Sequence, residues 1–159
     1  MRRLLAIGAA IGAVVFAGTA ALADNNGQAP RAVDTPPVAV EDFAYPQADK
    51  IFKEQGILLK RGDGHIVLAD CASATDLLEV WARGKDRFCF RVTGDQGYLS
   101  LELPAVYGVK GNAYETEVNM TVEGEEKTFE VDKNAWTPVG ETADPEERDH
   151  LLLEIVSTK

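Results

Sequence analysis

Most of this chain consists of short stretches in which apolar and polar residues alternate, separated by turns rich in glycine and aspartate. Successive side chains of a β-strand point to opposite faces, so such alternation predicts strands with one buried face and one solvent face. The clearest examples have their apolar positions at Leu99, Leu101 and Leu103, and at Val118, Met120 and Val122. This pattern excludes a mainly helical fold and favours an antiparallel sandwich or barrel.

The strands are expected at residues 57–61, 65–71, 77–83, 87–93, 98–103, 114–122, 127–132 and 151–157. Ahead of them, Ala48, Ile51 and Phe52 recur at helical spacing and Gly56 can end the helix, which predicts one short helix. We therefore predict an all-β protein, an antiparallel β-sandwich-like single domain over residues 47–159 with one short N-terminal helix.

The first 23 residues have the pattern of an export signal. Arg2 and Arg3 form a positive start, residues 4–16 are apolar and uncharged, and residues 21–23 are of the kind that a signal peptidase reads. The apolar run is short and rich in Gly and Ala, which argues against an uncleaved membrane anchor. We expect a secreted, extracellular protein whose mature chain starts near Asp24.

The charge balance limits the kinds of partner. The chain carries 26 acidic and 16 basic side chains, and removal of residues 1–23 takes away two arginines and no acid, which leaves 26 against 14, or −12. Nucleic acids and anionic membrane surfaces would repel such a chain, so neither is an expected partner.

Two cysteines in an exported chain predict one disulfide between Cys71 and Cys89. A metal site is not expected, because neither His65 nor His150 stands at ligand spacing from a cysteine. In the strand at 87–93 the aromatic residues on either side of Cys89 should face the core. Cys89 should therefore lie on the outer face or rim of its sheet.

Residues 24–46 are predicted to form an extended or disordered Pro-rich arm, because Pro30, Pro36, Pro37 and Pro46 prevent a continuous helix. The arm is either a passive spacer or a segment that becomes ordered when it binds a partner. Arg31 is a long cation between small residues in an extended segment. A trypsin-like cleft would accept it as a substrate, an inhibitor or a permanently bound segment.

The rest of the sequence offers weak candidates for chemistry. Two histidines and two paired cysteines are a poor supply for nucleophilic catalysis, so neither an enzyme nor a cofactor is expected. A Ca²⁺ site could be built from Asp144, Glu146 and Asp149, although their spacing is not that of an EF-hand. The tripeptide at residues 61–63, Arg-Gly-Asp, is interpreted as part of the glycine turn of a hairpin formed by the strands at 57–61 and 65–71, and not as an adhesion signal.

A sugar-stacking platform is another alternative. The aromatic side chains that could form it are Trp81, Tyr98, Tyr107, Tyr114 and Trp136. Such residues are more often core or rim residues than parts of a ligand platform.

Several motifs together resemble small secreted proteins of filamentous soil bacteria, in particular the small adaptor subunit of umbrella toxin particles. These motifs are "ADKIFKEQGI", "LKRGDGHIVLADC", "FCFRVTG", "GYLSLELPAVYGV" and "WTPVGE". The resemblance covers residues 43–159, and the arm is matched by position only. Its motifs are structural and not catalytic.

The resemblance implies a non-enzymatic linker between two larger secreted proteins. The arm would lie in the cleft of a lectin subunit with a trypsin-like domain, and the β-domain would bind the helical repeats of a toxin subunit. The implied arm contacts are Ala29, Pro30, Arg31, Ala32, Val33, Asp34, Thr35, Pro36, Pro37 and Val38, with Arg31 as the anchor. The alternatives are a protease-inhibitor-like protein that uses the same arm, and a stand-alone carbohydrate-binding module.

Overall fold

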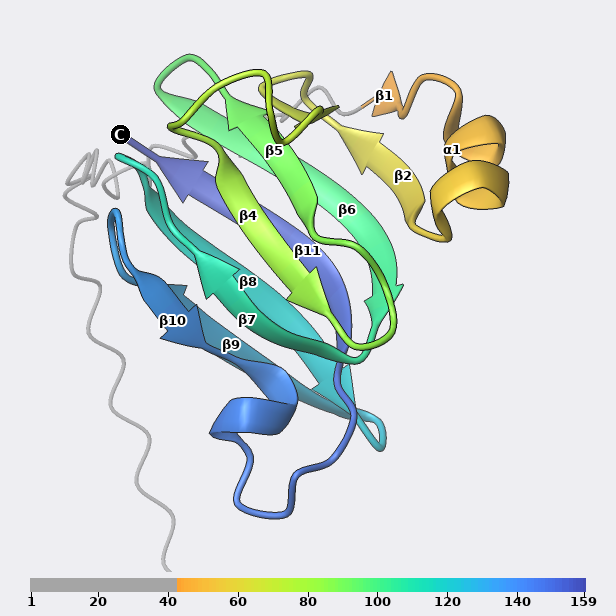
Figure 1. Ribbon diagram of the computed structural model, residues 1–159, viewed down its shortest axis with the longest axis vertical. Coiled ribbons are helices and arrows are strands. Elements are labelled where there is room, and N and C mark those ends of the chain that lie inside the picture. Colours follow the sequence, from red (N-terminus) through yellow and green to blue (C-terminus); the bar gives the residue numbers. More distant parts are fainter. Residues whose placement is uncertain (1–42) are drawn as a thin grey trace, which may run out of the picture. The chain divides into compact units, whose positions relative to one another are not determined.

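The computed structural model describes residues 43–159, which form two antiparallel β-sheets (Figure 1). The six-stranded sheet has the order β1 (Phe43–Ala44), β2 (Leu58–Gly62), β6 (Gln96–Pro104), β11 (Leu151–Thr158), β8 (Glu115–Val122) and β9 (Glu125–Val131). The five-stranded sheet has the order β10 (Trp136–Pro138), β7 (Val106–Lys110), β4 (Leu78–Ala82), β5 (Phe88–Val92) and β3 (Ile66–Ala69). One α-helix, α1 (Ala48–Gln55), and one 3₁₀ turn, η1 (Gly140–Ala143), complete the described elements.

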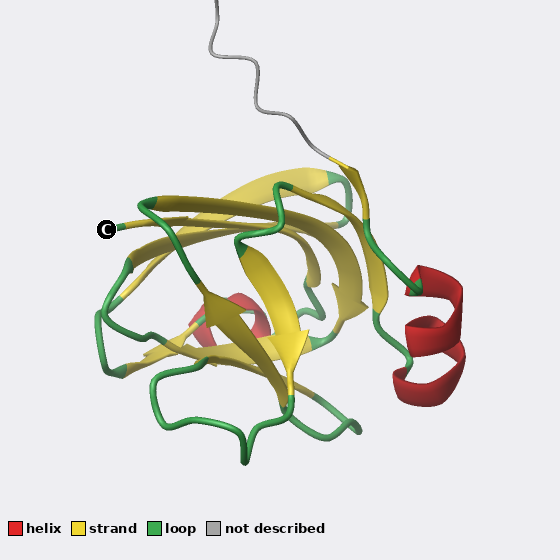
Figure 2. Cartoon of the chain, turned by 90° about the horizontal axis from the view of Figure 1, so that it is seen from above, coloured by secondary structure: helices red, strands yellow, loops and turns green. Residues whose placement is uncertain are grey.

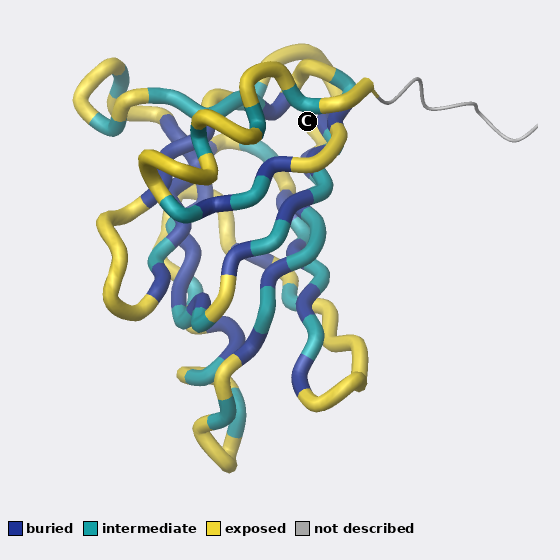
Figure 3. Tube along the Cα trace, turned by 90° about the vertical axis from the view of Figure 1, so that its right-hand side faces the viewer, coloured by how far each residue is buried: buried dark blue, intermediate teal, exposed yellow. Residues whose placement is uncertain are grey.

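The two sheets form two layers with the apolar core between them (Figure 2). The alternation predicted for β6 and β8 is confirmed, because every second residue of both strands is buried (Figure 3). The predicted all-β sandwich with one short helix is therefore confirmed. Helix α1 lies beside the layers and has no buried residue, and its Phe52 is 51% exposed.

Two sequence predictions about local pairing differ from the structure. The stretches at 57–61 and 65–71 were expected to form a hairpin, but β2 and β3 belong to different sheets, so the glycine turn between them is a corner. Strands β7 and β10 were not predicted. β7 contains Gly108 and follows Pro104, and β10 has three residues and ends on Pro138. Both are short, and neither alternates clearly.

The described domain begins before position 47. Phe43 and Ala44 pair with the end of β2, and the Tyr45 N–H donates to the Lys60 carbonyl at 2.9 Å. The Tyr45 hydroxyl accepts a 2.8 Å hydrogen bond from the N–H of Leu68 on β3. Tyr45 therefore joins the edge strands of the two sheets and covers a donor that an edge strand would otherwise present to solvent.

The Arg-Gly-Asp tripeptide has a structural role in this corner. Gly62 ends β2, and a Cβ there would lie 2.9 Å from the Tyr98 carbonyl oxygen. Asp63 Oδ1 accepts a hydrogen bond from the His65 N–H at 2.9 Å, and Gly64 has a φ of +83° that favours glycine. The tripeptide is therefore part of a glycine turn, as predicted, and the positive φ of this turn lies on Gly64.

The predicted disulfide is present, and joins Cys71 after β3 to Cys89 on β5. Phe88 and Phe90 belong to the core cluster and Cys89 does not, so the cystine lies on the outer side of the five-stranded sheet, as the alternation predicts. Cys89 is nevertheless only 1% exposed. The bond ties the loop after β3 to the neighbouring strand.

Candidate interaction surface

The outer face of the five-stranded sheet carries a row of residues that crosses all five strands. The register pairs Ala69 with Cys89, Cys89 with Glu79, Glu79 with Lys110, and Lys110 with Trp136. In Figure 1 this sheet faces the viewer, with β4 and β5 in front of β6 and β11. The residues come from distant parts of the chain, and the sheet brings them onto one surface.

Glu79 is the centre of an ion-pair cluster on this face. Its carboxylate accepts a 3.0 Å bond from Arg87 Nη1 on one oxygen and a 3.0 Å bond from Lys110 Nζ on the other. Glu79 is 9% exposed, whereas the side chains of Arg87 and Lys110 are 45% and 44% exposed. A nearly buried carboxylate needs such partners, because its desolvation would otherwise be costly. Both cations are held in place while their outer surfaces remain accessible.

Trp81 lies next to this cluster on β4. The Arg87 guanidinium lies 5.7 Å from the centre of its ring, within the range of a cation–π interaction. The Trp81 Nε1–H is buried and has no hydrogen-bond acceptor among residues 43–159. A buried donor without a partner costs about 1–3 kcal/mol. The Trp81 Nε1–H is thus a donor that no described residue uses.

Trp136 lies on the edge strand β10 and is 46% exposed. Its indole packs against Gly108, where a Cβ would lie 2.6 Å from Cε2 of the ring. Gly108 pairs with Trp81 on the other side, so it separates the two tryptophans and leaves room for both. Any larger residue at 108 would push Trp136 off the sheet. We call Glu79, Trp81, Arg87, Lys110 and Trp136 the Trp–Arg patch.

The composition of the Trp–Arg patch is that of a binding surface. Tryptophan and arginine are the residues most enriched among those that dominate the energy of protein interfaces. An exposed indole beside fixed cations can also stack on a sugar ring. Each side chain is held by a neighbour, so little ordering is needed on binding.

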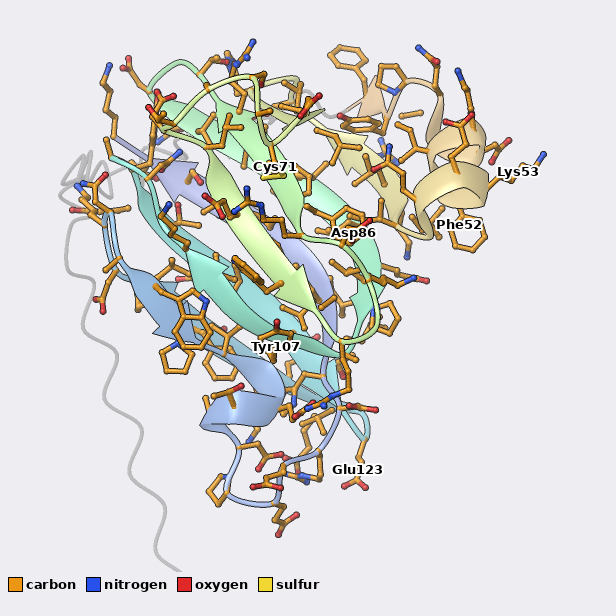
Figure 4. The ribbon with its side chains drawn as sticks, in the orientation of Figure 1. Phe52, Lys53, Cys71, Asp86, Tyr107 and Glu123 are labelled. Atoms are coloured by element: carbon orange, nitrogen blue, oxygen red, sulfur yellow. A yellow bond between two sulfur atoms is a disulfide. The ribbon has the colours of Figure 1, made fainter. Side chains whose placement is uncertain are left out.

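The structure brings together only part of the aromatic set considered from the sequence. Trp81 and Trp136 lie on the two strands that flank Gly108, and Tyr107 precedes that glycine on β7 (Figure 4). Tyr98 lies on β6 in the other sheet, and the Tyr114 hydroxyl donates to the Gly94 carbonyl at 2.8 Å. The role of Gly108 and of the buried Glu79 was not visible without the pairing of β7.

Two of the three acidic residues considered for Ca²⁺, Asp144 and Glu146, are held by Arg148. Arg148 Nε donates to Asp144 Oδ2 at 2.7 Å, and Arg148 also pairs with Glu146 and with Glu123, labelled in Figure 4 at the β8–β9 turn. The hydrogen bond from Arg148, together with one from the Glu146 N–H, lowers the pKa of Asp144 to about 2, against a smaller opposing effect of desolvation. Within residues 43–159 no group of three or more His, Cys, Asp or Glu side chains is arranged to hold a metal ion.

A second surface feature lies between α1 and the β4–β5 turn. It is a hollow of about 690 Å³ lined by Glu54, Gln55 and residues 84–88, including Asp86 (Figure 4). Its lining mixes both signs of charge and offers little apolar surface. The Trp–Arg patch is the stronger candidate because it combines exposed aromatic area with fixed charge.

Residues 29–38, the predicted arm contacts, lie outside the described residues, as do the predicted signal peptide and most of the arm. Helices α1 and η1, with eight and four residues, both fall short of the length that a bilayer crossing needs. A comparison with sequence models of known families found no match, and a comparison with curated proteins found none either.

Proposed function

We propose that this chain is a secreted, non-enzymatic adaptor that joins two larger proteins of an antibacterial toxin complex. Residues 29–38 of the arm, with Arg31 as the anchor, bind a lectin subunit with a trypsin-like domain. The β-sandwich binds the toxin-bearing subunit through its helical repeats. The resemblance of the sequence motifs to umbrella toxin adaptors suggests these two partners.

The observation that carries the proposal is the position of the Trp–Arg patch. An adaptor needs two binding surfaces that do not overlap. The described chain starts at Phe43 on β1, one outermost strand of the six-stranded sheet, and Tyr45 links this edge to β3. Trp136 is on β10, which is the opposite edge of the five-stranded sheet from β3. A partner on the patch therefore leaves the Phe43 edge accessible.

Secretion is supported by the leader-like residues 1–23 and by the Cys71–Cys89 disulfide, since disulfides persist in oxidising compartments. The test is purification of the tagged protein from the culture medium of its producer, followed by mass spectrometry. The proposal predicts two larger proteins in stoichiometric amounts. A lone monomer in native medium would contradict it.

A stand-alone carbohydrate-binding module is the second candidate, favoured by the exposed Trp136, which packs on Gly108, the strand neighbour of Trp81. A glycan array separates the two functions. The adaptor predicts no glycan bound by the domain alone, whereas the module predicts binding that Trp136→Ala abolishes. The inhibitor-like alternative predicts that saturating protein blocks trypsin, and unimpaired trypsin activity would dismiss it.

A further inference from the structure

The outer faces of the two sheets differ in charge. On the six-stranded sheet the outward positions carry Glu102, Glu115, Glu117, Glu126, Glu130 and Glu154 against Lys60 and Arg61. On the five-stranded sheet they carry Arg91 and Lys110 against Glu79, and Arg87, directly before β5, is bonded to Glu79 on the same face. The five-stranded face is thus a basic surface on a chain with a formal charge of −10.

Within residues 43–159, the cations of this face outnumber the carboxylates that are paired with them. Arg87 and Lys110 share the single carboxylate of Glu79, which leaves one positive charge in excess. Arg91 is exposed, its guanidinium donates to the Ser73 hydroxyl at 3.5 Å, and no ion pair of it is found among residues 43–159. A binding partner with carboxylates would complete these interactions.

The size of the surface favours a polypeptide over a single sugar. Arg91 on β5 and Trp136 on β10 are separated by β4 and β7, and strands are about 4.8 Å apart, so the two side chains start roughly 15 Å from each other. That span equals about five residues of extended chain. A single sugar ring on Trp136 would not reach Arg91.

We propose that the outer face of the five-stranded sheet binds an acidic segment of a protein partner. Carboxylates of the segment lie against Arg91, Arg87 and Lys110, and an apolar side chain lies on the Trp136 indole. The inference rests on the adaptor function, whose β-sandwich partner it describes. It assigns that partner an acidic binding surface, whereas the net charge of this chain alone would favour a basic one.

The direct probe is the peptide Glu-Glu-Leu-Pro-Pro-Leu-Glu-Glu, with its glutamine analogue as the neutral control, titrated against the mature protein at low salt. The acidic peptide should bind more tightly than the neutral one, and added salt should weaken it. Arg91→Glu should weaken binding by about tenfold or more, the scale of one close charge pair. Equal binding of the two peptides would overturn the inference.

Two matched variants control for general effects of charge and apolar surface. Lys60→Glu makes the same charge change on the other sheet, at a side chain that is 40% exposed. Phe52→Ala removes a comparably exposed aromatic ring from α1, as Trp136→Ala does from the patch. Arg91→Glu and Trp136→Ala should weaken peptide binding, and the two controls should not. Losses of equal size in all four variants would contradict the inference.

A galacturonic acid hexamer tests the other class of anion. If it binds with a dependence on Trp136 while the acidic peptide does not bind, the face is a saccharide site and the inference is wrong. The adaptor function fails separately, when no protein co-purifies from native medium although the acidic peptide binds the outer face of the five-stranded sheet. If a partner is retained by Arg91→Glu and released by Lys60→Glu, the adaptor stands and the inference fails.

Discussion

At the scale of single residues, the unpaired donor of Trp81 gives the sharpest prediction. Phenylalanine keeps most of the ring under Arg87 and removes the buried N–H, which has no acceptor among the described residues. Trp81→Phe should therefore leave the free energy of unfolding unchanged or raise it by up to about 1 kcal/mol, because the lost contact area offsets part of the gain. Urea unfolding of the wild type and the variant measures this difference in unfolding free energy. A loss above about 2 kcal/mol would mean that the N–H is satisfied in solution.

The lowered pKa of Asp144 predicts that the stability of the fold depends on pH in the acid range. Its pKa of about 2 lies below the ordinary value of 3.8, chiefly because Arg148 donates a hydrogen bond to it. A lowered pKa stabilises the fold above the unfolded pKa, and this contribution is lost as the pH falls from about 4 toward 2. In Asp144→Asn the contribution is absent at every pH. The difference in melting temperature between wild type and variant should shrink over this range, and a constant difference would contradict the assignment.

Individual residues show why the patch could be predicted only in part. In the strand at 77–83, residues two positions apart share a face, so the sequence alone puts Glu79 and Trp81 on the same side of the sheet. Nothing local indicated that Trp136 would lie against Gly108, since the two are 28 positions apart and meet only because β7 and β10 pair. The contact is set by the fold and not by a motif.

At the scale of elements, strands with strict alternation were predictable and irregular ones were not. β6 and β8 have long runs of every second residue buried, which the hydrophobic pattern alone specifies. β1, β7 and β10 have two, five and three residues and are defined by their neighbours. The assignment of β2 and β3 to one hairpin was wrong because a glycine turn does not reveal which sheet the next strand joins.

The disulfide connects two of these elements and lends itself to a stability test. It closes a loop with a sequence separation of 18. By lowering the conformational entropy of the unfolded chain, such a bond stabilises the fold by about 3 kcal/mol. Replacing Cys71 and Cys89 together by alanine should lower the unfolding free energy by about that amount and leave the Trp–Arg patch intact. Near-ultraviolet circular dichroism reports the tryptophan environment. If the folded double variant has a near-ultraviolet spectrum different from that of the wild type, the disulfide also positions the patch.

At the scale of the whole molecule, the proposal depends on two separate binding surfaces. One is the arm at residues 29–38, and the other is the outer face of the five-stranded sheet. The fold places Trp136 and Phe43 at opposite edges of the described domain. A mutation that abolishes partner binding at one surface should therefore leave partner binding at the other unchanged. This independence is a stronger claim than binding alone, because an inhibitor or a carbohydrate module would need only one surface.

The most direct measurement is a reciprocal co-purification from the producer's medium. One variant lacks residues 24–40, and the other carries Trp136→Ala together with Arg91→Glu, with the Phe52→Ala and Lys60→Glu pair as its control. Quantitative mass spectrometry should show that the deletion variant loses one large partner and keeps the second. The Trp136→Ala, Arg91→Glu variant should keep the first partner and lose the second. Loss of the same partner from both variants, or no partner with the wild type, would contradict the adaptor function.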